Sequence, residues 1–219
     1  MQFLDAGDLK DEKVTALIYG PPGIGKTTLL GTLPGKTLVI DVDKGCSVLK
    51  GRKGVKIKAL GEDLDGLKES LEYLQQKCEF DNVCVDSLSE LERSMLTIYG
   101  RKGDNDGAPE LGHYLRAQYK LMDYCRLFRA LPANVIFTAW ETADELTAST
   151  GEKYTRSRPL IAAKIVDNVC GLCDVVGRLA VSDKEETAGE RFIRLTGGTT
   201  YIAKDRIGKR QYCKFEELI

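Results

Sequence analysis

Residues 20–27 read Gly20-Pro21-Pro22-Gly23-Ile24-Gly25-Lys26-Thr27, and they lie between an apolar run, Val14–Tyr19, and Thr28-Leu29-Leu30. The stretch fills the pattern G-x-x-x-x-G-K-[ST]. A strand that enters a glycine turn, which then opens a helix, directs several backbone N–H groups toward one point. The pattern and its flanks therefore predict a phosphate-binding loop. The alternative is a glycine-rich turn that binds nothing.

The loop and a second strand together predict a nucleoside triphosphate site with Mg²⁺. Lys26 is expected to reach the β- and γ-phosphates, and the Thr27 hydroxyl to be a ligand of Mg²⁺. A later apolar strand ends in Asp86, which we expect to be the second Mg²⁺ ligand. Asp86 could instead cap the next helix, but Ser87-x-x-Glu90 already supplies a capping box. The predicted nucleotide-binding residues are Gly20, Pro21, Pro22, Gly23, Ile24, Gly25, Lys26, Thr27 and Thr28.

Length and composition favour a single cytoplasmic domain. The chain has 219 residues, a formal net charge of −1 and a pI near 6.0. These values predict one domain, residues 14–219, preceded by a peripheral segment, residues 1–13, in which Phe3–Ala6 spells F-x-x-A. No apolar run is long enough to cross a membrane, and the acidic opening is unlike a signal peptide. The seven scattered cysteines, including Cys170 and Cys173, are typical of reduced core residues.

The order of the remaining elements predicts an α/β fold with a mostly parallel central sheet flanked by helices. Apolar runs indicate strands, and apolar residues at steps of three and four indicate helices. A final antiparallel pair is expected, turned at Gly197-Gly198. The predicted strands are 14–19, 37–43, 55–59, 80–86, 134–141 and 174–181, the predicted helices are 64–78, 88–98, 113–131 and 161–173, and the antiparallel pair is 191–195 with 199–203.

Two basic stretches are candidates for contact with single-stranded DNA. Residues 44–58 contain six cations and no acid, and residues 150–159 form a predicted turn with cations around one tyrosine. Cations can follow a phosphate backbone while an aromatic ring stacks on a base. Solvated loops would look much the same in sequence. The candidate residues are Lys50, Arg52, Lys53, Lys153, Tyr154, Arg156 and Arg158.

From about Val14 to Arg206 the order of motifs resembles the RecA/RadA recombinase core. It is most similar to the short phage-encoded P-loop ATPases that include single-strand annealing proteins. The stretch Lys204-Asp205-Arg206-Ile207-Gly208 is similar to the K-N-R-F-G of RadA proteins. The resemblance implies ATP as the nucleotide, Asp43 as the carboxylate that orients the attacking water, and Thr138 as the polar group nearest to the place of a phosphate-sensing glutamine. It also implies that Lys204 and Arg206 reach the γ-phosphate of a neighbouring subunit.

These features predict a Mg²⁺-dependent ATPase in DNA recombination or repair that binds or anneals single-stranded DNA. The expected assembly is a homo-oligomer, either a ring or a filament, without membrane contact. Asp43 is one methylene shorter than the glutamate of the family, which predicts weak hydrolysis. Two other functions fit the same loop. One is a small-molecule kinase, and the other is a nucleotide-switched interaction module with little turnover.

Overall fold

The computed structural model describes residue 5 and residues 13–61, 64–182 and 187–219. Most of the segment 1–13, including most of Phe3–Ala6, lies outside these described residues. The described strands are β1 (Thr15–Gly20), β2 (Thr37–Asp41), β3 (Val55–Ala59), β4 (Asn82–Asp86), β5 (Asn134–Thr147), β6 (Lys153–Pro159), β7 (Val175–Val181), β8 (Arg191–Arg194), β9 (Lys204–Asp205) and β10 (Tyr212–Cys213). The described helices are α1 (Lys26–Leu30), α2 (Asp65–Gln76), α3 (Leu88–Arg101), α4 (Leu111–Arg129) and α5 (Val166–Leu172), with short 3-10 helices η2 (Cys46–Leu49) and η4 (Phe215–Glu217).

The strands form a sheet in the order β10-β8-β7-β1-β5-β4-β2-β3, with β6 beside β5 and β9 beside β7. Every neighbouring pair from β7 to β3 is parallel, whereas β8, β9 and β10 pair antiparallel. The expected α/β fold with a mostly parallel sheet and antiparallel C-terminal strands is therefore confirmed. The carboxyl ends of the parallel strands share one edge, where ligands of such sheets bind.

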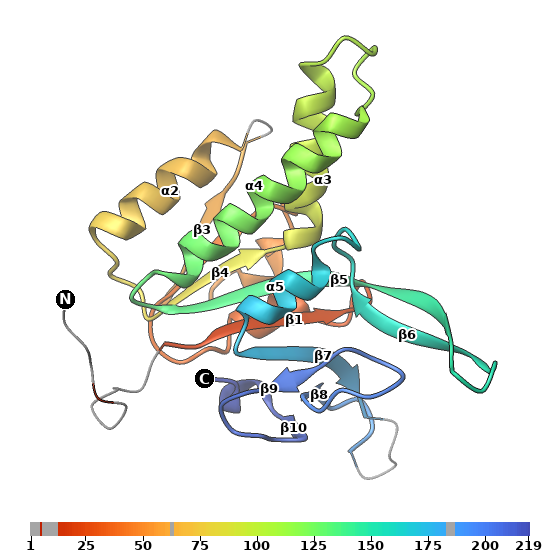
Figure 1. Ribbon diagram of the computed structural model, residues 1–219. Helices are drawn as coiled ribbons and strands as arrows, with labels where there is room; N and C mark the ends of the chain where they lie inside the picture. Colours follow the sequence, from red (N-terminus) through yellow and green to blue (C-terminus); the bar gives the residue numbers. More distant parts are fainter. Residues whose placement is uncertain (1–4, 6–12, 62–63, 183–186) are drawn as a thin grey trace.

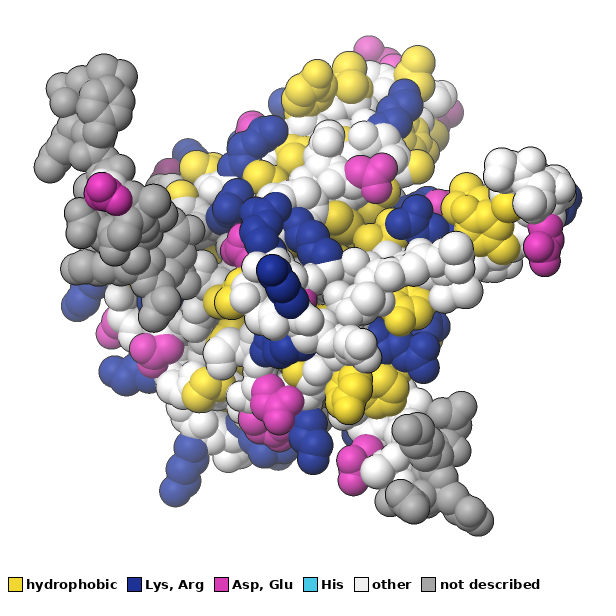
Figure 2. Space-filling view, turned by 60° about the horizontal axis from the view of Figure 1, so that its bottom comes forward, with side chains coloured by type: hydrophobic (Ala, Val, Ile, Leu, Met, Phe, Trp, Pro, Cys, Tyr) yellow, Lys and Arg dark blue, Asp and Glu magenta, His cyan; other side chains and the backbone are white. Residues whose placement is uncertain are grey.

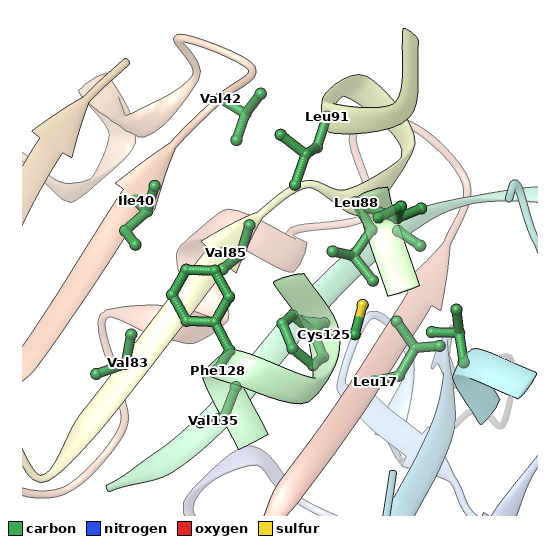
Figure 3. Close-up of a cluster of buried hydrophobic side chains, with 14 of the residues drawn as sticks. Leu17, Ile40, Val42, Val83, Val85, Leu88, Leu91, Cys125, Phe128 and Val135 are labelled. Atoms are coloured by element: carbon green, nitrogen blue, oxygen red, sulfur yellow. The ribbon is translucent and has the colours of Figure 1, made fainter. Parts of the chain in front are cut away.

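Alternation along β1 divides the core into two layers. Leu17 and Tyr19 face the layer formed with α2 to α5, and Ala16 and Ile18 face the layer formed with α1, η2 and the C-terminal strands. In the first layer the ring of Phe128 on α4 lies over β4 and β5 (Figure 3). Both faces of β1 are buried, which is why its sequence is a continuous apolar run. No helix in the described part of the chain is long and apolar enough to cross a membrane.

The predicted turn at residues 150–159 is wrong, because most of it is strand β6. β5 continues to Thr147 and pairs with β6 over seven residues, so that the two form a hairpin that extends beyond the sheet (Figure 1). The turn itself is short and has Gly151 at a φ of 86°. This strand was not predicted because its residues are mostly polar. A hairpin that projects into solvent does not need alternating apolar residues.

The predicted pairing of residues 191–195 with 199–203 is also wrong. β8 pairs with β7 and β10 instead, and Tyr201 forms only an isolated bridge, to Ser157 of β6. The reason is burial. Ile193 is fully buried and lies against Gly177, where a Cβ would come within 2.2 Å of the Ile193 side chain. Close packing on β7 stabilises this register more than a local hairpin could.

Candidate functional site

The loop of residues 20–25 has the glycine geometry that the motif requires. Gly23 and Gly25 have φ angles of 76° and 104°, in the left-handed region that favours glycine. Arg191 of β8 supports the loop, because its Nε donates a 2.7 Å hydrogen bond to the carbonyl of Ile24. A Cβ at Gly25 would lie 3.0 Å from that Nε, so a larger residue would press on this support. The loop follows the carboxyl end of β1.

Lys26 places a buried ammonium group at this loop. Its side chain is 8% exposed, and its Nζ donates hydrogen bonds to the carbonyl oxygens of Gly20 (2.9 Å) and Pro21 (3.1 Å). Burial lowers the pKa of Lys26, and the nearby carboxylates of Asp86, Asp43 and Glu141 act in the opposite direction. The ammonium is therefore held among acids and main-chain oxygens, where phosphate oxygens can replace the loop carbonyls as acceptors.

Asp86 is held by two hydroxyl groups. The Thr27 Oγ1 donates to one carboxylate oxygen of Asp86 at 2.6 Å, and the Thr138 Oγ1 donates to the other. The register of β4 and β5 brings Thr138 to Asp86, since both side chains face the α1 layer. Burial raises the pKa of Asp86, which is 1% exposed, and the two threonine hydrogen bonds lower it in part.

Thr27 and Asp86 fit a Mg²⁺ ion. They supply one hydroxyl and one carboxylate, and Mg²⁺ commonly uses one or two protein oxygens together with phosphate oxygens and waters. Within the described residues no group of three His, Cys, Asp or Glu could hold a metal, so a site built only from such side chains is not found there. When bound, Mg²⁺ supplies positive charge at the phosphate oxygens.

The carboxylate of Asp43 is fixed on both of its oxygens. One oxygen accepts hydrogen bonds from the backbone N–H (3.0 Å) and the hydroxyl (2.9 Å) of Ser87. The other accepts from the indole Nε1 of Trp140 at 3.1 Å, and the Arg93 guanidinium lies 4.8 Å from the centre of the Trp140 ring. Donors from β5 and from the start of α3 therefore set the direction of this acid.

Lys204 and Arg206 lie at the opposite edge of the sheet from the loop. Lys204 donates to the carbonyls of Cys170 (2.7 Å) and Gly171 (3.3 Å) in α5, and Arg206 lies 3.6 Å from Asp174, just before β7. These contacts lie at the amino ends of β1 and β7, whereas the loop follows the carboxyl end of β1. Six residues of strand separate the two edges by roughly 20 Å. Neither cation can reach phosphates in the loop of its own chain.

Residues 12–207 match the AAA domain family AAA_24, which covers most of the chain. The chain belongs to this family. No curated protein sequence matches it significantly. The assignment agrees with the geometry of the loop and supports a P-loop ATPase, with the nucleotide and Mg²⁺ that such domains use.

Several solved structures resemble this AAA domain. The flagellar accessory protein FlaH from Methanocaldococcus jannaschii is 10% identical, with a TM-score of 0.46, and the match covers 91% of this chain and 83% of that one. A KaiC-like protein from Pyrococcus horikoshii is 12% identical, with a TM-score of 0.48 and coverage of 84% and 79%. The assembled ATPase EscN of the type III secretion system of enteropathogenic E. coli is 16% identical, with a TM-score of 0.45 and coverage of 77% and 43%.

The two groups of DNA-binding candidates in this AAA domain do not come together. Lys50, Arg52 and Lys53 are exposed and precede β3, at the amino ends of the strands. Lys153 and Tyr154 begin β6, on the hairpin that extends from the carboxyl end of β5 (Figure 1). The structure therefore does not form one continuous basic strip from these residues.

Arg158 is engaged within the chain. Its Nε donates to Asp144 at 2.5 Å, and its Nη1 donates to the carbonyls of Pro159 (3.1 Å) and Ile161 (2.9 Å). These bonds fix the base of the hairpin and engage the Nε and Nη1 of Arg158 within its own chain. Arg156 is half-buried, and its buried Nε has no hydrogen-bond partner among the described residues. Lys153 lies 3.4 Å from Glu145, and this ion pair is weak because the two side chains are 71% and 68% exposed.

Three residues of the AAA domain that lie near the loop were missed from sequence. Arg178 of β7 binds Glu141 of β5 through two nitrogens, with a shortest distance of 2.8 Å, and Arg191 supports the loop. Glu141 could have been found, because it ends the predicted strand 134–141 in the same way that Asp43 and Asp86 end theirs. Its partner could not, because no local pattern relates β7 to β5.

Proposed function

We propose that this AAA domain is a Mg²⁺-dependent ATPase that works as a homo-oligomer in DNA recombination or repair and holds single-stranded DNA. The observation that carries the proposal is the convergence of Lys26, Thr27, Asp86 and Thr138 at the carboxyl edge of the sheet. Lys26 is proposed to neutralise the β- and γ-phosphates of ATP. Thr27 and Asp86 are proposed to hold the metal ion, and Thr138 to fix the direction of Asp86.

Asp43 is proposed to orient the water that attacks the γ-phosphate. Ser87 and Trp140 already hold its carboxylate in one direction, which lowers the entropic cost of positioning a water. The acid would accept a hydrogen bond from that water while the γ-phosphate transfers to it. Because aspartate is short and both of its oxygens are already engaged, the expected turnover is slow.

Arg206 is proposed to act on the ATP of a neighbouring subunit. Its side chain is 57% exposed, whereas the ammonium of Lys204 is occupied by two α5 carbonyls. Of the two predicted cations, Arg206 is therefore better placed to contact a neighbouring subunit. This role requires an oligomer, since Arg206 lies at the sheet edge opposite its own loop.

Replacing Arg206 with alanine should lower ATP turnover by roughly 10³-fold while leaving ATP affinity nearly unchanged, because the guanidinium stabilises the transition state in trans. Titration calorimetry and a phosphate-release assay measure the two quantities. Arg129→Ala is the matched control, since Arg129 also lies near Asp174, at 3.8 Å. Mixing Arg206→Ala with Lys26→Ala subunits should restore part of the activity. An Arg206→Ala protein with full turnover would exclude the trans role.

The direct test of the proposed function is ATP hydrolysis with Mg²⁺, measured with and without single-stranded DNA and together with light scattering for mass. Stimulation by single strands, and a mass above that of one chain, are expected. The exposed cations Lys50, Arg52, Lys53 and Lys153 support the DNA partner. Salt should screen their attraction to DNA phosphates, so DNA binding should weaken as the salt concentration rises. ATP consumption that requires a small-molecule acceptor and is not changed by DNA would contradict the proposal.

A further inference from the structure

The C-terminal strands expose a row of arginines and aromatic rings on one side of the sheet. Arg178 of β7, Arg194 of β8 and Tyr212 of β10 are register partners across three neighbouring strands. Phe192 lies on the same face as Arg194, since both alternate with the buried Ile193. We call the residues Arg178, Phe192, Arg194, Tyr201 and Tyr212 the arginine–aromatic face.

The rings and guanidinium groups of this face contact one another. Arg194 lies 5.5 Å from the ring centre of Phe192 and 5.7 Å from that of Tyr201. Arg178 also lies over Tyr201, at 5.9 Å. Tyr212 packs edge-on against Phe192, with 6.3 Å between the ring centres, and it is 68% exposed. The planar groups are thus held in place before any partner binds, and one large ring remains open to solvent.

The charge of the face is not balanced. Like charges directly opposite each other on two strands are unfavourable, so the pair of Arg178 and Arg194 has a cost. Glu141 offsets Arg178 through three hydrogen bonds. For Arg194, within the ranges that the structure describes, the contacts found are with the two rings and with no acid. In the part of the chain that the structure describes, the face therefore presents Arg194 without a counter-charge beside the exposed ring of Tyr212.

We propose that the arginine–aromatic face binds single-stranded nucleic acid. A phosphate would neutralise Arg194, and a base would stack on Tyr212, which is how sheets and grooves with such side chains hold single strands. Duplex bases are already stacked and do not offer the same contact. This inference rests on the proposed DNA partner but assigns it to a surface that none of the sequence candidates contains.

The position of the face links it to the β5–β6 hairpin. Tyr201 bridges to Ser157 of β6, and the main chain on both sides of that bridge accepts hydrogen bonds from the Tyr19 hydroxyl. A single-stranded nucleic acid bound to the face would therefore lie next to the hairpin. Figure 2, which brings the C-terminal strands forward, shows Lys and Arg side chains beside hydrophobic ones near that hairpin. The surfaces can act as one path, whereas Lys50, Arg52 and Lys53 lie at the other edge.

The test is fluorescence anisotropy of a labelled oligo-dT with the full chain, in low and moderate salt. Tyr212→Ala should raise Kd roughly ten-fold, and Tyr212→Phe should keep the affinity because the ring remains. Arg194→Ala should raise Kd by a similar factor and make the plot of log K against log salt shallower by about 0.7. Lys68→Ala on α2 is the control, since Lys68 is 74% exposed and has no role in either proposal, and it should leave Kd nearly unchanged. Circular dichroism and thermal melting verify the fold of each variant.

Equal affinity in the wild type and in folded Tyr212→Ala and Arg194→Ala variants would overturn this proposal, as would equal binding of duplex and single strand. ATP hydrolysis without DNA should be unchanged in both variants, since neither residue contacts the nucleotide loop. If the protein hydrolyses ATP and these substitutions leave its DNA affinity unchanged, only the assignment of DNA binding to the face would be wrong. A protein that binds oligo-dT through the face but hydrolyses no ATP would contradict the proposed ATPase alone.

Discussion

Replacing Lys26 with alanine is expected to abolish detectable ATP turnover, with a loss of at least roughly 10³-fold, and to weaken ATP binding. The buried ammonium group is the cation near Asp86 and Asp43, so its removal leaves these two acids facing the phosphates without it. Repulsion would then oppose both binding and the transition state. A phosphate-release assay and calorimetry with Mg²⁺-ATP measure the two effects.

The control for Lys26→Ala is Lys68→Ala, because Lys68 is 74% exposed and forms a surface pair with Glu72. It should change neither turnover nor affinity. Circular dichroism and thermal melting verify that the Lys26→Ala variant is folded. If folded Lys26→Ala protein bound ATP as tightly as the wild type, the assignment of the loop as the nucleotide site would be wrong.

Replacing Asp86 with asparagine is expected to lower turnover by roughly 10²- to 10³-fold and, at the same time, to stabilise the protein. Burial raises the pKa of Asp86, so the folded state binds a proton more readily than the unfolded state does. The contribution of this group to stability is therefore present at acid pH and is lost as pH rises through the folded pKa. Asparagine carries no charge at any pH and can still pair with the Thr27 and Thr138 hydroxyls.

The expected gain for Asp86→Asn at neutral pH is about 1 kcal/mol, which raises Tm by roughly 2–4 °C for a chain of this size. Thermal melts from pH 4 to pH 8 measure it, and the difference from the wild type should shrink toward the acid end. Asp123→Asn is the control, since Asp123 is 59% exposed and forms a surface pair with Arg126. An Asp86→Asn protein that melts lower at neutral pH would show that the charge stabilises the site.

The fold was predictable from sequence where burial imposes a pattern. Both faces of β1 and β4 are buried, so their continuous apolar runs predicted these strands. The sequence also predicted that Thr27 and Asp86 lie together at the carboxyl ends of the parallel strands. The hairpin β5–β6 and the pairing of β8 were not predictable. The first has no buried face along much of its length, and the second depends on a contact between Ile193 and Gly177.

The site was predictable as a set of side chains but not as a set of contacts. Lys26, Asp86 and Thr138 lie together because strands 14–19, 80–86 and 134–141 are neighbours, which the order of motifs implied. The donors that fix Asp43 are non-local, since Trp140 is 97 residues away along the chain. The same holds for Arg178 and Glu141, whose meeting requires β7 to lie two strands from β5.

The placement of Arg206 and the nucleotide loop at opposite edges of the sheet has a consequence for kinetics if Arg206 acts in trans. Such contacts are head-to-tail. In a closed ring every nucleotide site receives an Arg206 from its neighbour, whereas in an open filament the site at one end receives none. An isolated subunit would be almost inactive, and a linear pair would reach half of the maximal rate per subunit. Specific activity should therefore rise with protein concentration, and it should fall on dilution before any loss of folded structure.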